Sequence, residues 1–401
     1  MKFLRTGRNI SAVLLAGFVL FFAAAFTAGA EEPLKIGAIM PVTGSCAKAG
    51  RGSVNAIEMA VEEINKAGGI SGRQIQLIHE DDESMPAVSV AAAEKLTVKD
   101  KVHAVIGAFN SSCVLAHMQV TQREGVPQID PIAFSFKITR SGNPFMFRNI
   151  PQANILGEKF GDFIAGQSGA KTWAIIHENT DYGLDYKKFI APRLEKTAKI
   201  LTTETYSPGD TDFYSQLTKV KNLKPDAILF ISNMTEGTQL IKQLRELQIK
   251  SQLFATGSLA TQQFRDLAGP GADGLYSLSF LEMSTPSPLA KKFIDSYKSK
   301  YGYEPDYFAA ASYDSVYIIA EGMKTAYRTN GDKWPEDLKP FRKMIRDGIA
   351  SINGYQGVQG KVMWNQYGEA PTDIYWIQWV GGKTRIIDII KAEDVYKSMI
   401  Q

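Results

Sequence analysis

Residues 34–79 read LKIGAIMPVTGSCAKAGRGSVNAIEMAVEEINKAGGISGRQIQLIH, and this stretch decides the fold class. Its first seven residues are an apolar run typical of a buried strand. After a glycine-containing loop, four apolar residues follow the 3.6-residue period of one helix face: Val54, Ile57, Val61 and Ile64. Glycines at 68–69 end this helix, and residues 75–79 form the next strand. This order predicts a β-α-β unit with parallel strands.

The same alternation continues along the chain. A helix at 87–98 precedes a strand at 102–106, and the rhythm restarts after residue 151. Four further strands with helices between them are expected at 172–177, 200–205, 227–231 and 252–255. Long helices then follow at 288–301, 308–327 and 336–349, and the closing strands at 361–364, 373–380 and 384–390. The pattern predicts an α/β fold with two Rossmann-like units, each a parallel sheet with helices on both faces.

The first 30 residues have the composition of a cleavable secretory signal peptide. Lys2, Arg5 and Arg8 precede an apolar run at 10–26, and Ala28-Gly29-Ala30 supplies small residues for cleavage. The alternative is a membrane anchor, for which the run is short. We expect export to the periplasm, without direct insertion of the mature chain into the membrane.

The charge balance excludes an excess of basic residues in the mature chain. The chain has 45 basic and 42 acidic residues, and loss of Lys2, Arg5 and Arg8 leaves 42 of each. Nucleic acid is therefore not expected as a partner. The four histidines have no metal-ligand spacing, and no nucleophile elbow, P-loop or dinucleotide fingerprint occurs. We predict no enzyme activity, no metal and no cofactor.

In open parallel sheets, ligands bind in loops that follow the carboxyl ends of strands. Two such units that face each other would form a cleft. The loops that follow this rule are 41–52, 107–113, 131–139, 178–185, 232–237 and 256–261.

Several motifs in and around these loops resemble one family. KIGAIMPVTG at 35–44, VIGAFNSS at 105–112, TWAIIHENTDYG at 172–183 and KVMWNQYG at 361–368 are similar to the leucine/isoleucine/valine-binding proteins. These are type I periplasmic binding proteins of ABC importers. The similarity covers residues 35–380, and it lies in the ordered series rather than in any single motif.

The resemblance implies two lobes joined by a three-crossover hinge that closes on the ligand. Lobe one would comprise residues 31–151 plus 281–374, and lobe two residues 152–280 plus 375–401. It also implies a small-molecule ligand, ABC transporter permease subunits as partners and a monomeric protein.

The resemblance also suggests ligand-binding residues. Ser111 matches a serine that holds the ligand's carboxylate, and Ser112 beside it is the alternative; either serine would otherwise be a helix cap. In the second head-group loop, which includes Ala133, the family binds the ligand through backbone groups and a threonine. Phe134 replaces this threonine, so that Ser135 would supply the hydroxyl, and Phe134 would either stack on a flat ligand or belong to the core. Tyr182 matches a tyrosine that lines the cleft, with a turn position as the alternative. Phe308 lies near an aromatic residue that lines the side-chain pocket, with core packing as the alternative.

Three positions depart from the family's amino-acid binders. Gly257 stands where those proteins place a glutamate against the ligand's ammonium, Asn233 replaces a tyrosine, and Ala49 replaces another. A buried ammonium without a carboxylate partner would be costly. Asp181, Glu178 or Glu236 would be substitutes. These departures favour a ligand other than a standard aliphatic amino acid, and a small carboxylate without an α-ammonium fits at least as well. The expected ligand class is a small carboxylate, either an amino acid or a related organic or aromatic acid.

Two alternatives remain open for the function: a ligand-sensing receptor that serves a signalling partner, and a binder of amide or urea-type solutes. The two cysteines, Cys46 and Cys113, follow strands that should be neighbours. A disulfide between them is therefore a hypothesis.

Overall fold

The computed structural model describes residues 32–281, 283–284 and 287–400, so the predicted signal peptide at 1–30 lies outside the described residues. The first sheet has the order β2-β1-β3-β4-β5 with all strands parallel. Its strands are β1 (Leu34–Ile39), β2 (Ile75–Glu80), β3 (Ala104–Gly107), β4 (Gln128–Asp130) and β5 (Met146–Arg148). The central strand β3 is buried along its whole length because helices cover both faces.

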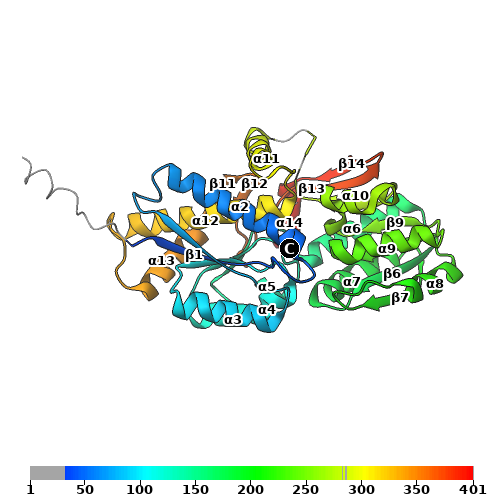
Figure 1. The fold of residues 1–401 in the computed structure, drawn as a ribbon, viewed down its shortest axis with the longest axis horizontal. Helices are drawn as coiled ribbons and strands as arrows, with labels where there is room; N and C mark the ends of the chain where they lie inside the picture. The colour runs from blue at the N-terminus through cyan, green and yellow to red at the C-terminus, as the bar shows by residue number, and fades with distance from the viewer. Residues whose placement is uncertain (1–31, 282, 285–286, 401) are drawn as a thin grey trace, which may run out of the picture. The chain divides into compact units, whose positions relative to one another are not determined.

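Helices from two distant parts of the chain pack on this sheet. α2 and α12 lie on one side of it, and α3 and α4 on the other (Figure 1). The helices of this group are α2 (Ala47–Lys66), α3 (Pro86–Glu94, continued by a π-helical turn Lys95–Lys99), α4 (Ser111–Arg123), α5 (Lys137–Arg140), α11 (Pro288–Tyr301), α12 (Tyr307–Thr329) and α13 (Leu338–Ala350). A small hairpin of β11 (Asn353–Gly357) and β12 (Gly360–Met363) contacts α12. We call these elements together the first half.

The second sheet has the order β14-β13-β10-β9-β8-β6-β7. Its strands are β6 (Thr172–Glu178), β7 (Lys199–Tyr206), β8 (Ala227–Ile231), β9 (Gln252–Ala255), β10 (Tyr276–Ser279), β13 (Ile374–Val380) and β14 (Lys383–Ile390). The first five are parallel, but β13 and β14 are antiparallel additions. The second sheet is therefore parallel except at this edge, where β14 follows β13 through the two-residue turn at Gly381-Gly382, which only an antiparallel pair permits.

The helices on the second sheet also form two layers. α6 and α7 pack against one face, and α8, α9 and α10 against the other. These helices are α6 (Ala153–Ser168), α7 (Asp181–Leu194), α8 (Tyr214–Leu223), α9 (Met234–Glu246) and α10 (Gln262–Ala268), with 3-10 turns at Gly257–Ala260 and Gly269–Ala272. A last helix that the sequence did not predict, α14 (Ala392–Ile400), contacts α6. These elements form the second half.

The chain passes between the halves three times: between β5 and α6, between β10 and α11, and between β12 and β13. Each half therefore contains segments that are far apart in the sequence. The return of α12 to the first sheet brings its amino-terminal residues close to the loops after β3 and β4.

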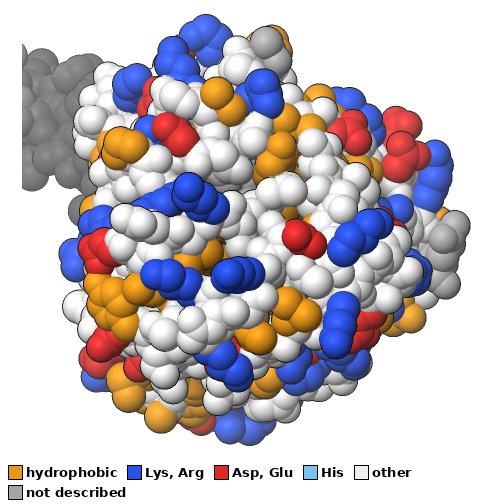
Figure 2. All heavy atoms as spheres, turned by 90° about the vertical axis from the view of Figure 1, so that its right-hand side faces the viewer, with side chains coloured by type: hydrophobic (Ala, Val, Ile, Leu, Met, Phe, Trp, Pro, Cys, Tyr) orange, Lys and Arg blue, Asp and Glu red, His pale blue; other side chains and the backbone are white. Residues whose placement is uncertain are grey.

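The surface of the second half carries charges of both signs. Figure 2 shows Lys and Arg side chains scattered among Asp, Glu and uncharged atoms on this face. Across residues 32–281, 283–284 and 287–400, no helix combines the length and the apolar character needed to cross a bilayer.

Candidate functional site

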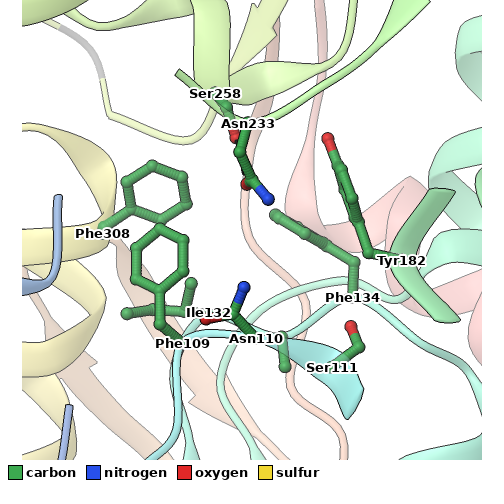
Figure 3. A pocket seen from close by; sticks show the side chains of 10 residues that line it. Phe109, Asn110, Ser111, Ile132, Phe134, Tyr182, Asn233, Ser258 and Phe308 are labelled. Carbon is green, nitrogen blue, oxygen red and sulfur yellow. Dashed lines mark hydrogen bonds between the residues drawn. The ribbon is translucent and has the colours of Figure 1, made fainter. Parts of the chain in front are cut away.

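A small cavity lies between the two halves. The first half lines it with Phe109, Asn110, Ser111, Ile132, Ala133, Phe134 and Phe308, and the second half with Tyr182, Asn233 and Ser258. Figure 3 shows these side chains converging from both halves. The cavity volume is about 20 Å³, which is room for a single water molecule.

The strand ends of both sheets place these residues. Asn110 and Ser111 follow β3, and the segment from Ile132 to Phe134 follows β4. In the second half, Tyr182 lies in the first turn of α7 after β6, and Asn233 directly precedes α9 after β8. The carboxyl ends of parallel strands lie at one edge of a sheet, so the two sheets present their loops to each other.

Aromatic rings form the walls of the cavity. The rings of Phe109 and Phe308 lie 4.9 Å apart between centroids, tilted by 54°. On the other side, the rings of Phe134 and Tyr182 lie 6.2 Å apart. Tyr182 is held in place because its hydroxyl shares a hydrogen bond with Thr256 in the loop after β9. The walls thus suit an apolar or flat ligand body.

Two further spaces adjoin this cavity. A second cavity of about 10 Å³ shares Phe109, Asn233, Ser258 and Phe308 with it; its other lining residues are Ser45, Cys46, Ala49, Met234 and Thr235. A larger groove of about 390 Å³ shares Asn110, Ser111 and Tyr182 and opens toward Pro86, Leu184 and Pro208.

Three helices begin at these cavities: α2, α4 and α9. Their N-cap residues are Cys46, Asn110 and Asn233, and none of the three side chains caps its helix. The first N–H groups of a helix lack partners within the helix and carry a partial positive charge. Three converging amino termini therefore make the site favourable for an anion.

Two buried carboxyl groups lie off the cavity wall: Glu178 lies behind Asn233, and Glu236 lies in the first turn of α9. Glu178 is 1% exposed and accepts hydrogen bonds from the side chains of Asn233 (2.8 Å) and Thr180 (3.0 Å). Burial raises the pKa of Glu178 to about 7, and nearby Glu236 contributes to this rise. Burial also raises the pKa of Glu236, which accepts a hydrogen bond from the N–H of Gly209.

Six of the nine predicted ligand-binding residues line the first cavity: Ser111, Ala133, Phe134, Tyr182, Asn233 and Phe308. Ligand contact by these six stays a prediction. The other three do not line it. Ser112 lies in the adjoining groove and donates to Asp181, and Ser135 donates to Asp185.

Gly257 lies outside the cavity because its surroundings are filled. A Cβ atom at this position would lie 2.6 Å from the hydroxyl oxygen of Tyr307. Tyr307 is 1% exposed, and its hydroxyl has no hydrogen-bond partner among the described residues. The Tyr307 hydroxyl therefore occupies the space that a side chain at 257 would need.

Sequence reasoning missed Phe109, Asn110, Ile132 and Ser258 as lining residues. All four lie within loops that the strand-end rule had selected, at 107–113, 131–139 and 256–261. The rule identifies loops, but it does not tell which side chains in a loop point inward.

Cys46 and Cys113 are not bonded to each other in this structure, and both are buried. Burial raises the pKa of both thiols. Cys46 instead accepts a hydrogen bond at 3.3 Å from the side chain of Asn110. Pairing of the two cysteines in the exported protein stays a prediction.

Two α/β halves joined by three crossings, with a cavity between facing strand ends, define the class of two-lobed binding proteins. A family model described as periplasmic binding protein matches residues 33–384. The chain therefore belongs to the periplasmic binding protein family.

Individual proteins that are similar to this chain are also binding proteins. A leucine-, isoleucine-, valine-, threonine- and alanine-binding protein from Pseudomonas aeruginosa is 30% identical over 340 residues, which cover 84% of this chain and 88% of the relative. The isoleucine complex of a branched-chain amino acid transporter substrate-binding protein from Streptococcus pneumoniae is 28% identical. Its TM-score is 0.80, over 90% of this chain and 100% of that chain.

A further solved structure shares the fold at lower identity. It is a solute-binding protein of an ABC transporter from R. palustris in complex with benzoate, at 23% identity and a TM-score of 0.81, over 89% of this chain and 96% of that chain. The predicted family and the predicted fold class are thus confirmed.

Proposed function

We propose that the protein is the periplasmic solute-binding component of an ABC importer. It holds a small carboxylate-bearing ligand in the cleft between its halves, is exported through residues 1–30 and acts as a monomer without catalysis. The ligand is an amino acid or a related organic or aromatic acid. The observation that carries this proposal is the pair of adjoining uncharged cavities at which three uncapped helices begin.

The carboxylate end of the ligand belongs at the start of α4. None of the ten lining side chains is charged at neutral pH, so a bound carboxylate meets no repulsive partner on the wall. The hydroxyl oxygen of Ser111 accepts the N–H of Ser135 at 3.1 Å. Its own proton remains free to donate to a ligand oxygen, together with the N–H groups of the first helical turn.

The body of the ligand belongs against the rings of Phe109, Phe134 and Phe308. Flat or branched apolar groups gain from burial at such walls. A cavity of about 20 Å³ is too small for any such ligand, so the halves must separate to admit one. We propose that lobe one (31–151 plus 281–374) and lobe two (152–280 plus 375–401) move about the three crossings, and that the closed form docks on the permease.

The presence of an ammonium group on the ligand is a separate question. Position 257 offers no carboxylate, which favours a simple or aromatic acid. Glu178 lies one side chain away from the cavity, behind Asn233. It would serve a zwitterionic ligand if Asn233 turned aside. The P. aeruginosa relative is named as an amino-acid-binding protein, which supports an amino acid as the ligand.

Matched ligand pairs test the proposal. Thermal unfolding of the protein is measured with benzoate against benzamide and with L-leucine against leucinamide. A ligand at 100 times its Kd stabilises the folded state by about 2.7 kcal/mol. We expect at least one carboxylate to stabilise the protein and its amide to do much less.

Ser111→Ala should weaken that effect, whereas Ser141→Ala should not, because Ser141 bonds locally, to the carbonyl of Ile138 and the N–H of Asn143. Equal stabilisation by acids and amides would contradict the carboxylate assignment. Stabilisation by L-leucine alone would show that a group other than residue 257 meets the ammonium.

The transport role is tested separately. In cells whose gene for this protein is deleted, uptake of the stabilising ligand should fall and return with the restored gene. Unchanged uptake together with tight binding in vitro would refute the importer assignment.

A further inference from the structure

One face of α7 reaches across to the first half. Asp181, Asp185, Lys188 and Phe189 lie at helix positions i, i+4, i+7 and i+8, so their side chains share one face. We call these four residues the bridging stripe. Each of them contacts a residue of the first half: Ser112, Ser135, Phe136 or Lys137.

The outer contact of the stripe is polar and partly exposed. Asp181 accepts hydrogen bonds from the hydroxyl of Ser112 at 2.9 Å and from the ammonium of Lys137 at 2.8 Å. The side chains of Lys137 and Asp181 are 48% and 30% exposed. Water and salt screen such a pair, so it contributes little to closure.

The inner contact is buried. The side chain of Asp185 is 4% exposed and accepts the hydroxyl proton of Ser135, while the Lys137 ammonium lies 4.0 Å away. A carboxylate in this position loses its hydration, so the hydrogen bond from Ser135 is needed to offset that cost. The bond between Asp185 and Ser135 is therefore the energetically important one of the stripe.

Ser135 is held from three directions. Its hydroxyl donates to Asp185, its N–H donates to the hydroxyl oxygen of Ser111 at 3.1 Å, and its carbonyl accepts from Arg148 at 2.6 Å. The Ser135 N–H occupies a lone pair of the Ser111 hydroxyl and so directs the Ser111 proton elsewhere. Ser111 lines the cavity, so a displacement of Ser135 changes where that proton points.

We propose that Asp185 is a positioning residue that couples closure of the two halves to the ligand-facing hydroxyl of Ser111, through Ser135. When the halves meet, Asp185 fixes Ser135, and Ser135 then orients Ser111 toward the ligand carboxylate. The ligand-related part of this proposal rests on the proposed function, whereas the closure part does not.

The opposite rim of the cleft is held less firmly. There the hydroxyl of Thr235 donates to the carbonyl of Ser45 at 2.9 Å, a single uncharged bond at exposed atoms. The two rims therefore differ in kind, and loss of the Asp185 contact should affect closure more than loss of the Thr235 contact.

The first test measures closure without any ligand. Small-angle scattering gives the radius of gyration of the purified protein and of Asp185→Ala, Asp185→Asn and Thr235→Val. Asp162→Asn is the control, because the side chain of Asp162 is 57% exposed and forms an ion pair with Arg193 at 3.7 Å, away from the first half. We expect the radius of gyration to be larger for both Asp185 variants than for the Thr235 variant, and to be unchanged for the control. Unchanged radii for both Asp185 variants would overturn the closure role.

The second test is a double-mutant cycle on affinity, measured by calorimetry with benzoate and L-leucine as probes. Asp185→Ala should weaken binding about tenfold, since a buried charge-assisted hydrogen bond is lost. The double variant Asp185→Ala/Ser135→Ala should lose no more binding free energy than the single variant with the larger loss. In a Ser111→Ala background, Asp185→Ala should weaken binding less than about twofold.

A full tenfold loss in the Ser111→Ala background would show that Asp185 does not act through Ser111. Asp185→Asn keeps the side-chain shape, and it replaces Asp185→Ala if the latter does not fold. If neither probe binds the unmutated protein, the proposed ligand class fails. The scattering result still decides the closure role of Asp185.

Discussion

Gly257→Ala places a methyl group where the Tyr307 hydroxyl already lies. The added Cβ would be 2.6 Å from that hydroxyl oxygen, 3.1 Å from a methyl carbon of Leu278 and 3.2 Å from the Leu278 carbonyl oxygen. Since Tyr307 is buried, its ring has little space in which to retreat. Overpacking of this kind costs about 1–3 kcal/mol of the free energy of unfolding.

Tyr307→Phe removes the atom that makes the closest contact. The Tyr307 hydroxyl is buried and unpartnered within the described residues, so its removal alone should be neutral or stabilise by about 1 kcal/mol. In the double variant, the two Leu278 contacts remain, so recovery should be incomplete. We expect a favourable coupling energy of about 1–2 kcal/mol between the two substitutions.

Urea unfolding of the protein, the two single variants and the double variant measures this coupling. Additive effects within about 0.5 kcal/mol would refute the reasoning, because they would mean that the Tyr307 hydroxyl does not occupy the space at 257. The result also bears on the ligand. If the hydroxyl fills this space, a carboxylate cannot be introduced at 257 without also changing Tyr307.

Three further predictions follow from the buried ionisable groups. The folded-state pKa of Glu178, about 7, lies above its ordinary value of 4.5, so ionisation of Glu178 destabilises the fold as pH rises between those values. Relative to the unmutated protein, Glu178→Gln should gain up to about 3 kcal/mol of the free energy of unfolding between pH 4 and pH 8. Parallel pH profiles of the two proteins in urea unfolding would contradict this. Arg148→Met removes the ion-pair partner of Asp130, whose pKa is already raised to about 6 by burial. We expect the free energy of unfolding to fall by about 3–5 kcal/mol at pH 8 and by less at pH 5, where Asp130 becomes protonated. An equal loss at both pH values would exclude this cause. If Cys46 and Cys113 are thiols in the exported protein, they should react with a thiol reagent only after unfolding, since both are buried. A protein mass lower by two hydrogen atoms than that of the reduced protein, together with no reaction after unfolding, would instead establish the disulfide.

The periodicity of the sequence was sufficient for most of the secondary structure. The helix at 308–327 corresponds to α12 (Tyr307–Thr329), and the helix at 336–349 to α13 (Leu338–Ala350). The exceptions include the long helix α6 (Ala153–Ser168), which was not predicted, as well as short and terminal elements. The three-residue strands β4 and β5 are too short to show a period, and α14 follows a strand run without a clear break.

For the site, the sequence identified loops better than individual residues. Ser111 and Tyr182 lie on the cavity wall because each follows the carboxyl end of a strand, which is a local property. Ser135 lies in an equally well-placed loop, but its side chain turns to Asp185 of the other half. The direction of a side chain in a loop depends on partners that are remote in sequence.

The sequence by itself determined the α/β class and the family, because hydrophobic period and ordered motifs are local along the chain. It also showed that position 257 lacks a carboxylate. Only the tertiary structure decided what fills that position, since Tyr307 arrives there from a helix 50 residues further along. Likewise, only the folded chain brings Asp185 to Ser135 and Glu178 to Asn233. The first contact joins the two halves, and the second joins the ends of two neighbouring strands of one sheet. No local pattern records which distant side chain will meet which.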